Sequence, residues 1–177
     1  MGHMHRCFAF FAIAACVFLA SCSDNETTAP SAAPLVFSAT LVPSNEVPPV
    51  SNTESAGHGA VQIQFDVTRD AGGAITAATG TFYFRLTGYP AGTTIVGAHI
   101  HPAPAGVNGP VIISTGLATA NTRVLDNNGS GDFTFQGVFS DPTIVQQILN
   151  NPAAFYFNVH STTNPGGFSR GQLVRVQ

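Results

Sequence analysis

The chain has 177 residues, of which 44% are hydrophobic and only 8% are charged. This length and apolar content suit one ordinary domain that buries a core without disulfides or structural metals. The six basic residues are all arginines and form no run that could follow a phosphate backbone. We therefore expect one domain and no nucleic acid partner.

Residues 1–21 have the pattern of a signal peptide. Arg6 precedes an apolar run of 13 residues, Cys7 to Leu19. The run is too short to span a hydrocarbon core of about 30 Å as a stable helix, but its length is typical of the apolar part of a leader. The alternative is a buried apolar helix. Without the leader, five arginines face nine acids, a net charge of about −4.

The leader ends in Leu19-Ala20-Ser21-Cys22, which resembles the lipobox of bacterial lipoproteins. The resemblance implies cleavage before Cys22 and a diacylglycerol on its thiol. We therefore expect a protein anchored to a membrane outside the cytoplasm, at the outer membrane or the cell surface, with residues 22–34 as a flexible tether. Cys7 and Cys16 leave with the leader, so no thiol remains for a disulfide, a thiolate metal site or a nucleophile.

Residues 35–177 carry the alternation of apolar and polar residues that is typical of strands. It is clearest between Ala60 and Val67 (AVQIQFDV), and it recurs around three further groups of residues. These groups are Phe82, Phe84 and Leu86; Phe133 and Phe135; and Phe155, Phe157 and Val159. Turns rich in glycine and asparagine separate them. The pattern predicts an all-β domain, a Greek-key-like β-sandwich or barrel with one short helix.

The short helix is predicted after Asp141, which can cap its N-terminus, with Pro142 at the first helical position. Apolar residues follow at spacings of one helical turn: Ile144, Val145, Ile148 and Leu149. Asn150-Asn151-Pro152 ends the pattern. We expect this helix to cover a sheet edge or an open end of the sandwich.

Histidines are the candidate metal ligands. In Thr94–His101 (TIVGAHIH), alternation places Ile95, Gly97, His99 and His101 on one face, with the two imidazoles about 7 Å apart at Cβ. His160 lies opposite the apolar face of its own strand, so it can be a third ligand if the two strands are neighbours. His58, in Gly57-His58-Gly59, is interpreted as a turn residue.

Three neutral imidazoles favour copper or zinc over the hard cations that seek oxygen. The alternative is that His99 and His101 cap strand ends and hydrogen-bond to the loop Pro102–Pro110 without a metal. Arg170 could guide a small anion to the site. It could equally pair with a carbonyl or with Asp66. These alternatives remain open at this point.

Three segments together resemble the CHRD domain family, which is named for its occurrence in chordin and is widespread in bacterial secreted proteins. They are Phe37–Pro49 (FSATLVPSNEVPP), Gly97–Pro110 (GAHIHPAPAGVNGP) and Asn151–Leu173 (NPAAFYFNVHSTTNPGGFSRGQL). The resemblance implies a CHRD domain over residues 35–177, and it supplies a fold and a compartment more than an activity. In chordin the domain belongs to a protein that binds growth factors, and nothing here carries that role over.

A weaker likeness is to copper-zinc superoxide dismutase. It lies in Gly97-Ala98-His99-Ile100-His101, in Val159-His160 and in Arg170, which occupies the place of an anion-guiding arginine. The bridging histidine, the zinc-ligand loop with its aspartate and the paired cysteines of that family are not evident. The likeness therefore implies copper binding by three histidines, and zinc is less expected.

We therefore predict a lipid-anchored CHRD domain that binds copper through His99, His101 and His160 for metal handling or redox chemistry. One alternative is a metal-free binding or structural module at the cell envelope. The other is a copper-only enzyme similar to superoxide dismutase. The sequence does not decide whether the protein is an enzyme, and it names no protein partner.

Overall fold

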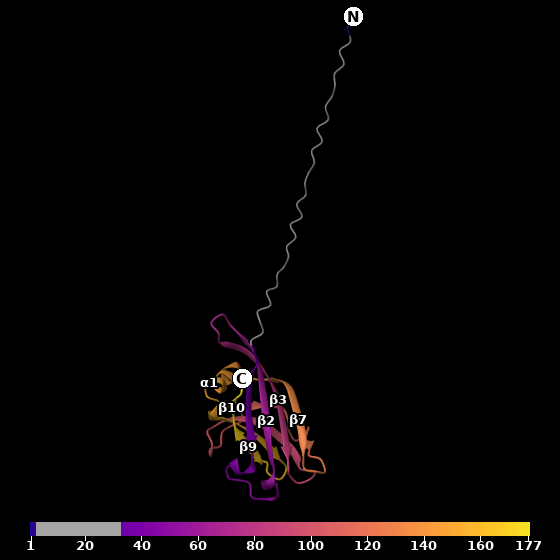
Figure 1. Cartoon of the computed structure of the whole chain (residues 1–177), viewed down its shortest axis with the longest axis vertical. Coiled ribbons are helices and arrows are strands. Elements are labelled where there is room, and N and C mark those ends of the chain that lie inside the picture. The colour runs from indigo at the N-terminus through magenta and orange to yellow at the C-terminus, as the bar shows by residue number, and fades with distance from the viewer. Residues whose placement is uncertain (3–32) are drawn as a thin grey trace. The chain divides into compact units, whose positions relative to one another are not determined.

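The computed structural model describes residues 1–2 and 33–177, and residues 33–177 form the domain (Figure 1). The predicted leader, most of the tether and the lipidation residue Cys22 lie outside the described residues. Within the described residues, no helix is long and apolar enough to cross a membrane.

The domain consists of two antiparallel sheets, as the alternation predicted. The first sheet has the strand order β10-β1-β2-β3-β7, and Figure 1 shows β2, β3 and β7 side by side. Its strands are β1 (Leu35–Leu41), β2 (His58–Arg69), β3 (Ile75–Thr87), β7 (Gly131–Phe139) and β10 (Val174–Arg175). The cleanest predicted strand, Ala60–Val67, lies inside β2. His58 is the first residue of β2 and not a turn residue.

The second sheet has the order β5-β4-β8-β9, and β6 also pairs with β4. Its strands are β4 (Thr94–Pro102), β5 (Ile113–Ser114), β6 (Arg123–Val124), β8 (Phe155–Ser161) and β9 (Ser169–Gln172). Because β3 pairs with β7 while β4 pairs with β8, the chain passes between the sheets repeatedly. These are Greek-key-like connections, and the predicted sandwich is confirmed.

The core between the sheets is rich in phenylalanine. Phe65 meets Phe82 edge to face with ring centroids 6.1 Å apart, and Phe82 stacks on Phe157 of the other sheet at 6.1 Å. Phe84 contacts Phe157 as well, at 5.5 Å. Such aromatic pairs contribute beyond the burial of their area, so these rings join the two sheets and hold them in one relative position.

One predicted facing in β4 is wrong. Ile95 was expected on the face of His99 and His101, but its side chain is fully buried in the core with Ile100. The pairing of β4 with β8 shifts register between Ile95 and Gly97. Such a β-bulge inserts one residue, so the alternation before it is reversed with respect to the alternation after it.

The helix α1 (Pro142–Asn150) forms as predicted. The Asp141 side chain accepts a hydrogen bond of 2.7 Å from the Thr143 N–H, which satisfies one of the free donors of the first turn. Val145 and Ile148 are fully buried, and α1 packs against β3. Short 3-10 turns complete the domain: η1 (Pro43–Asn45), η2 (Thr53–Ala56) and η3 (Pro152–Ala154).

The aromatic core gives a direct test of these packing assignments. Phe84 is fully buried, whereas Phe139 is 80% exposed. We expect Phe84→Ala to lower the free energy of unfolding by about 3–5 kcal/mol, because it removes buried area and leaves a cavity. Phe139→Ala is the matched control and should change it by less than about 0.5 kcal/mol. Equal effects in urea unfolding would contradict this core.

Candidate metal centre

Three histidines meet on the outward face of the second sheet. The pairing of β4 with β8 sets Gly97 opposite His160, His99 opposite Asn158 and His101 opposite Tyr156. The strand of His160 therefore neighbours the strand of the other two, as the three-ligand hypothesis required. The candidate ligand atoms of His99, His101 and His160 all lie within 4.8 Å of one another.

Hydrogen bonds to backbone carbonyls define which nitrogen is free in the rings of His101 and His160. His101 Nδ1 lies 3.0 Å from the Gly109 carbonyl oxygen, and His160 Nδ1 lies 3.0 Å from that of Pro165. A carbonyl only accepts, so each Nδ1 carries the proton and donates it, and each Nε2 keeps a lone pair. This orientation by a second group is typical of histidines that bind metals.

Each of the three rings has one buried nitrogen without a hydrogen-bond partner in the described part of the chain. These atoms are His99 Nδ1, His101 Nε2 and His160 Nε2. Buried polar atoms without partners are uncommon in folded proteins, and each calls for an explanation. The predicted alternative, in which a histidine bonds to the loop Pro102–Pro110, holds for His101. That bond uses Nδ1, however, and leaves the Nε2 lone pair available.

Gly97 makes room for two of the rings. A Cβ atom at this position would lie 2.9 Å from His99 Cε1 and 3.4 Å from His160 Cδ2. A side chain at this position would therefore displace the His99 ring, which packs against that of His160 with ring centroids 4.9 Å apart. The Gly-x-His-x-His pattern thus has a steric reason for its first residue.

The surroundings of the three imidazoles disfavour their protonated forms. Burial, together with the nearby rings of His160 and His101, lowers the pKa of His99 to about 4. Burial also lowers the pKa of His101 and of His160, although their hydrogen bonds to backbone carbonyls oppose the shift. All three imidazoles are therefore neutral at pH 7, which is the form that binds metals.

The nitrogen separations fit a shared ion after a small closure. Imidazole nitrogens lie 2.0–2.1 Å from a bound zinc, so two of them on one ion of this size are at most about 4 Å apart. The candidate ligand atoms in this structure lie up to 4.8 Å apart. Each nitrogen would therefore have to move toward the shared ion by less than about 1 Å. Rotation of the rings about their side-chain torsions can supply it.

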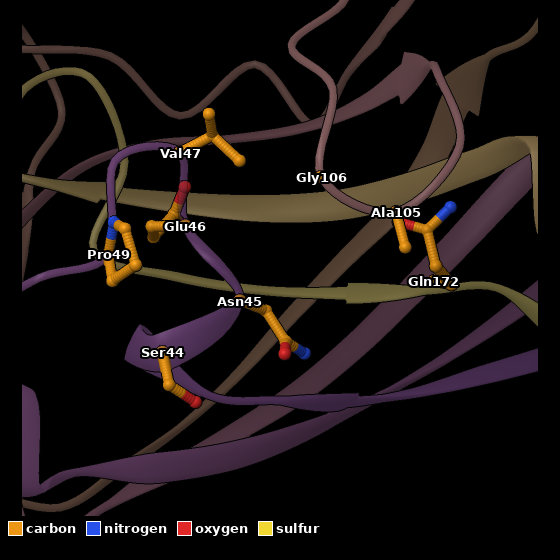
Figure 2. Close-up of a pocket in the computed structure, with 8 residues that line it drawn as sticks. All are labelled: Ser44, Asn45, Glu46, Val47, Pro49, Ala105, Gly106 and Gln172. Atoms are coloured by element: carbon orange, nitrogen blue, oxygen red, sulfur yellow. The ribbon is translucent and has the colours of Figure 1, made fainter.

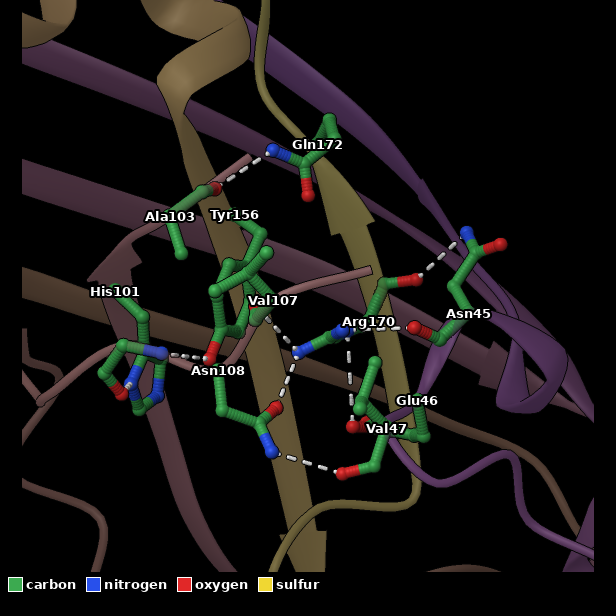
Figure 3. Close-up of polar contacts among 11 residues, drawn as sticks. Asn45, Glu46, Val47, His101, Ala103, Val107, Asn108, Tyr156, Arg170 and Gln172 are labelled. Atoms are coloured by element: carbon green, nitrogen blue, oxygen red, sulfur yellow. Dashed lines mark hydrogen bonds and ion pairs between the residues drawn. The ribbon is translucent and has the colours of Figure 1, made fainter. Parts of the chain in front are cut away.

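The Gly109 carbonyl is held by a network around Arg170 (Figure 3). The Arg170 guanidinium donates to Asn108 Oδ1 at 2.9 Å, and the Asn108 amide donates to the Val47 carbonyl at 2.9 Å. The Gly109 N–H donates to the Tyr156 hydroxyl at 3.2 Å. The loop that orients His101 is therefore fixed at Asn108 and at the Gly109 N–H, directly before its accepting carbonyl.

The Pro165 carbonyl is held by a second buried group. Glu54 is 1% exposed, and its carboxylate accepts hydrogen bonds from Ser161 Oγ, at 2.7 Å, and from the Asn164 amide. Asn164 directly precedes Pro165, and Ser161 directly follows His160. Glu54 therefore fixes the turn that orients the third histidine.

Arg170 is not placed as a surface guide. It is 1% exposed, and its Nε donates to the Asn45 carbonyl at 2.6 Å. This bond to a carbonyl was the predicted alternative, but the nearby acid is Glu46, at 3.9 Å, and not Asp66. Guiding an anion requires access to solvent, so the anion-guiding role stays a prediction that this geometry does not support.

Two neighbouring pockets are separate from the histidines. They have volumes of about 330 and 340 Å³ and share Glu46, Val47 and Pro49 among their lining residues; Figure 2 shows the first. The second is also lined by Pro165, whose carbonyl holds His160. Neither pocket is lined by a candidate ligand, so the histidine cluster and these cavities are different features.

Local sequence patterns did not identify several residues that support the histidine cluster. One is Tyr156, whose ring stacks on that of His101 with centroids 4.8 Å apart. Glu54 and Asn108 carry no local signal, because their partners lie 107 and 62 residues away in the chain. The two orienting carbonyls belong to the backbone, and no residue type marks them.

Fold and site together define an all-β sandwich with a three-histidine cluster on one outward face. The family model described as CHRD domain matches residues 37–173, so the chain belongs to the CHRD domain family, as its motifs indicated. No curated protein and no solved structure matches the chain. The likeness to superoxide dismutase stays a prediction.

The lowered histidine pKa values predict acid sensitivity of the metal-free protein. Above pH 6.5 the imidazoles are neutral in both states, so protons do not affect stability through them. Between pH 6.5 and about 4 the unfolded chain takes up protons that folded His99 refuses, so stability falls as the pH falls. Urea unfolding across this range should show a smaller loss for His99→Gln than for wild type. His58→Gln is the control, and a wild-type loss no larger than that of His99→Gln would contradict the assignment.

Proposed function

We propose that this CHRD domain binds one copper ion through His99, His101 and His160 and serves in metal handling outside the cytoplasm. The observation that carries the proposal is the cluster of three histidines whose candidate ligand atoms lie within 4.8 Å of one another, and each of these rings also has a buried nitrogen without a hydrogen-bond partner among the described residues. One ion would satisfy all three at once, which no single hydrogen-bond donor of the described fold does.

The donor set favours copper. Imidazole suits copper and zinc, whereas magnesium and calcium prefer oxygen ligands, and no carboxylate joins the cluster among the described residues. Structural zinc sites are almost always closed by four protein ligands, whereas three histidines with an open position suit catalytic zinc as well as copper. For equal donors, copper(II) also binds more tightly than zinc in the usual order of divalent metals.

The surroundings favour metal handling over dismutation of an anion. Loops 102–112 and 161–168, whose Gly109 and Pro165 carbonyls bond to His101 and His160, contain no charged residue. The nearby arginine, Arg170, is 1% exposed. Electrostatic steering of an anion needs accessible positive charge, so the superoxide dismutase-like alternative lacks this support here. The metal-free module is the alternative that the following experiment tests.

Copper binding should depend on the three histidines together. In the full chain with Cys7, Cys16 and Cys22 replaced by serine, so that thiols do not compete, we expect one more bound copper than in the same chain with His99→Ala, His101→Ala and His160→Ala. Each single change should weaken binding by more than the roughly 10- to 100-fold that is typical of changing a residue that only orients a metal ligand. Equilibrium dialysis with elemental analysis measures both quantities.

His58→Ala is the matched control, because His58 is an exposed histidine at the start of β2. It should leave stoichiometry and affinity unchanged. Equal copper binding by wild type and by the folded triple variant would reject the proposal and leave the metal-free module. Folding of the triple variant is checked by its far-UV circular dichroism and its cooperative thermal transition.

We also propose that a lipid on Cys22 holds the domain at a membrane surface. The support is the lipobox-like Leu19-Ala20-Ser21-Cys22 at the end of the apolar run, followed by a polar tether. Expressed in a bacterium, the wild type should fractionate with membranes and carry the mass of a diacylglycerol on Cys22. Cys22→Ser should lose both, and a variant that stays in the membrane fraction would contradict the anchor.

A further inference from the structure

We propose that the three-histidine centre prefers monovalent copper over divalent copper, and that buried Arg170, acting through Tyr156, sets this preference. The inference rests on the proposed copper binding and deepens it. Arg170 is a positioning residue in this proposal, because it lies behind Tyr156 and does not itself contact the cluster.

Arg170, Tyr156 and His101 form a continuous stack behind the centre (Figure 3). The Tyr156 ring is parallel to the His101 ring, with an interplanar angle of 4° and centroids 4.8 Å apart. The Arg170 Cζ atom lies 4.4 Å from the centroid of Tyr156, within the range of a cation–π contact. The guanidinium charge therefore faces the ligand across one aromatic ring.

The charge of Arg170 is only partly compensated. Its nearest acid is Glu46, with Nε and Oε2 3.9 Å apart, and burial raises the pKa of Glu46 to about 7 even though Arg170 opposes the shift. Arg170 also keeps one buried nitrogen, Nη2, without a hydrogen-bond partner in the described chain. A net positive charge thus stays in a region shielded from water, where charges interact strongly.

The ligands add no negative charge to offset the ion. All three are neutral imidazoles, and the candidate cluster contains no carboxylate or thiolate among the described residues. Burying an ionic charge is costly unless it is paired, and the cost rises steeply with the size of the charge. The smaller charge of monovalent copper is therefore favoured in this site, and the nearby guanidinium increases the difference.

The test compares the affinities for the two oxidation states. In the cysteine-free full chain, the affinity for monovalent copper is measured by competition with a coloured chelator under anaerobic conditions, and the affinity for divalent copper by competition with glycine. We expect wild type to bind monovalent copper more tightly. Arg170→Gln should lower the ratio of the two affinities about tenfold, which is a fall of about 59 mV in the one-electron potential.

Two variants separate charge from structure. Arg170→Lys keeps the cation and should retain most of the preference, whereas Arg85→Gln removes an arginine whose side chain is 65% exposed on the first sheet and should change nothing. If Arg170→Gln does not fold, Glu46→Gln, which removes the partial compensation of the Arg170 charge, should raise the ratio, and an unchanged ratio would overturn the role of that charge.

The failures are distinguishable. Absence of histidine-dependent copper binding in either oxidation state rejects the proposed function itself. Tighter binding of divalent copper by wild type overturns the preference while leaving copper binding intact. An unchanged ratio in folded Arg170→Gln overturns the role of Arg170, because loss of packing alone would weaken both affinities together.

Discussion

The antiparallel pairing of β4 with β8 is the interaction on which the candidate centre depends. Its register sets Gly97 opposite His160 and His101 opposite Tyr156, and the two-residue period of strands keeps these positions on one outward face. A slip of one residue would turn the histidines of one strand into the core. Full burial of Ile100 and Phe157 on the opposite face makes that slip costly, so the apolar core fixes the position of the polar site.

A layer of buried polar and charged side chains lies behind the histidines, and burial of such groups adds little to the stability of a fold. Arg170, Glu46 and Glu54 are 1%, 5% and 1% exposed, and buried charges often contribute less than apolar residues of similar volume. The contacts of Arg170 and Glu54 instead hold the backbone groups that orient two of the histidines. Arg170 bonds to Asn108, which directly precedes the Gly109 carbonyl that orients His101. Glu54 fixes the turn whose Pro165 carbonyl orients His160.

Sequence alone could predict what depends on local periodicity. Alternation identified β2 and β8, capping identified α1 at Asp141, and the strand period placed the paired histidines together. The sequence could not predict the bulge before Gly97. A bulge depends on how two strands pair, and this one leaves no mark in the alternation of apolar and polar residues. The sequence could not predict the burial of Arg170 either, because that burial results from loops distant in the chain closing over β9.

The distribution of charge separates this centre from sites that attract ions over a distance. The exposed ion pair of Arg85 and Asp132 lies on the first sheet, whereas the loops around the histidines are uncharged. A field that steers ions needs charge near the mouth of a site, and here the nearby charges are buried. Under the proposed metal binding, capture at this face would depend on direct ligand exchange. Partly exposed His99 and His160 would begin that exchange, and His101, which is 5% exposed, would complete it from within.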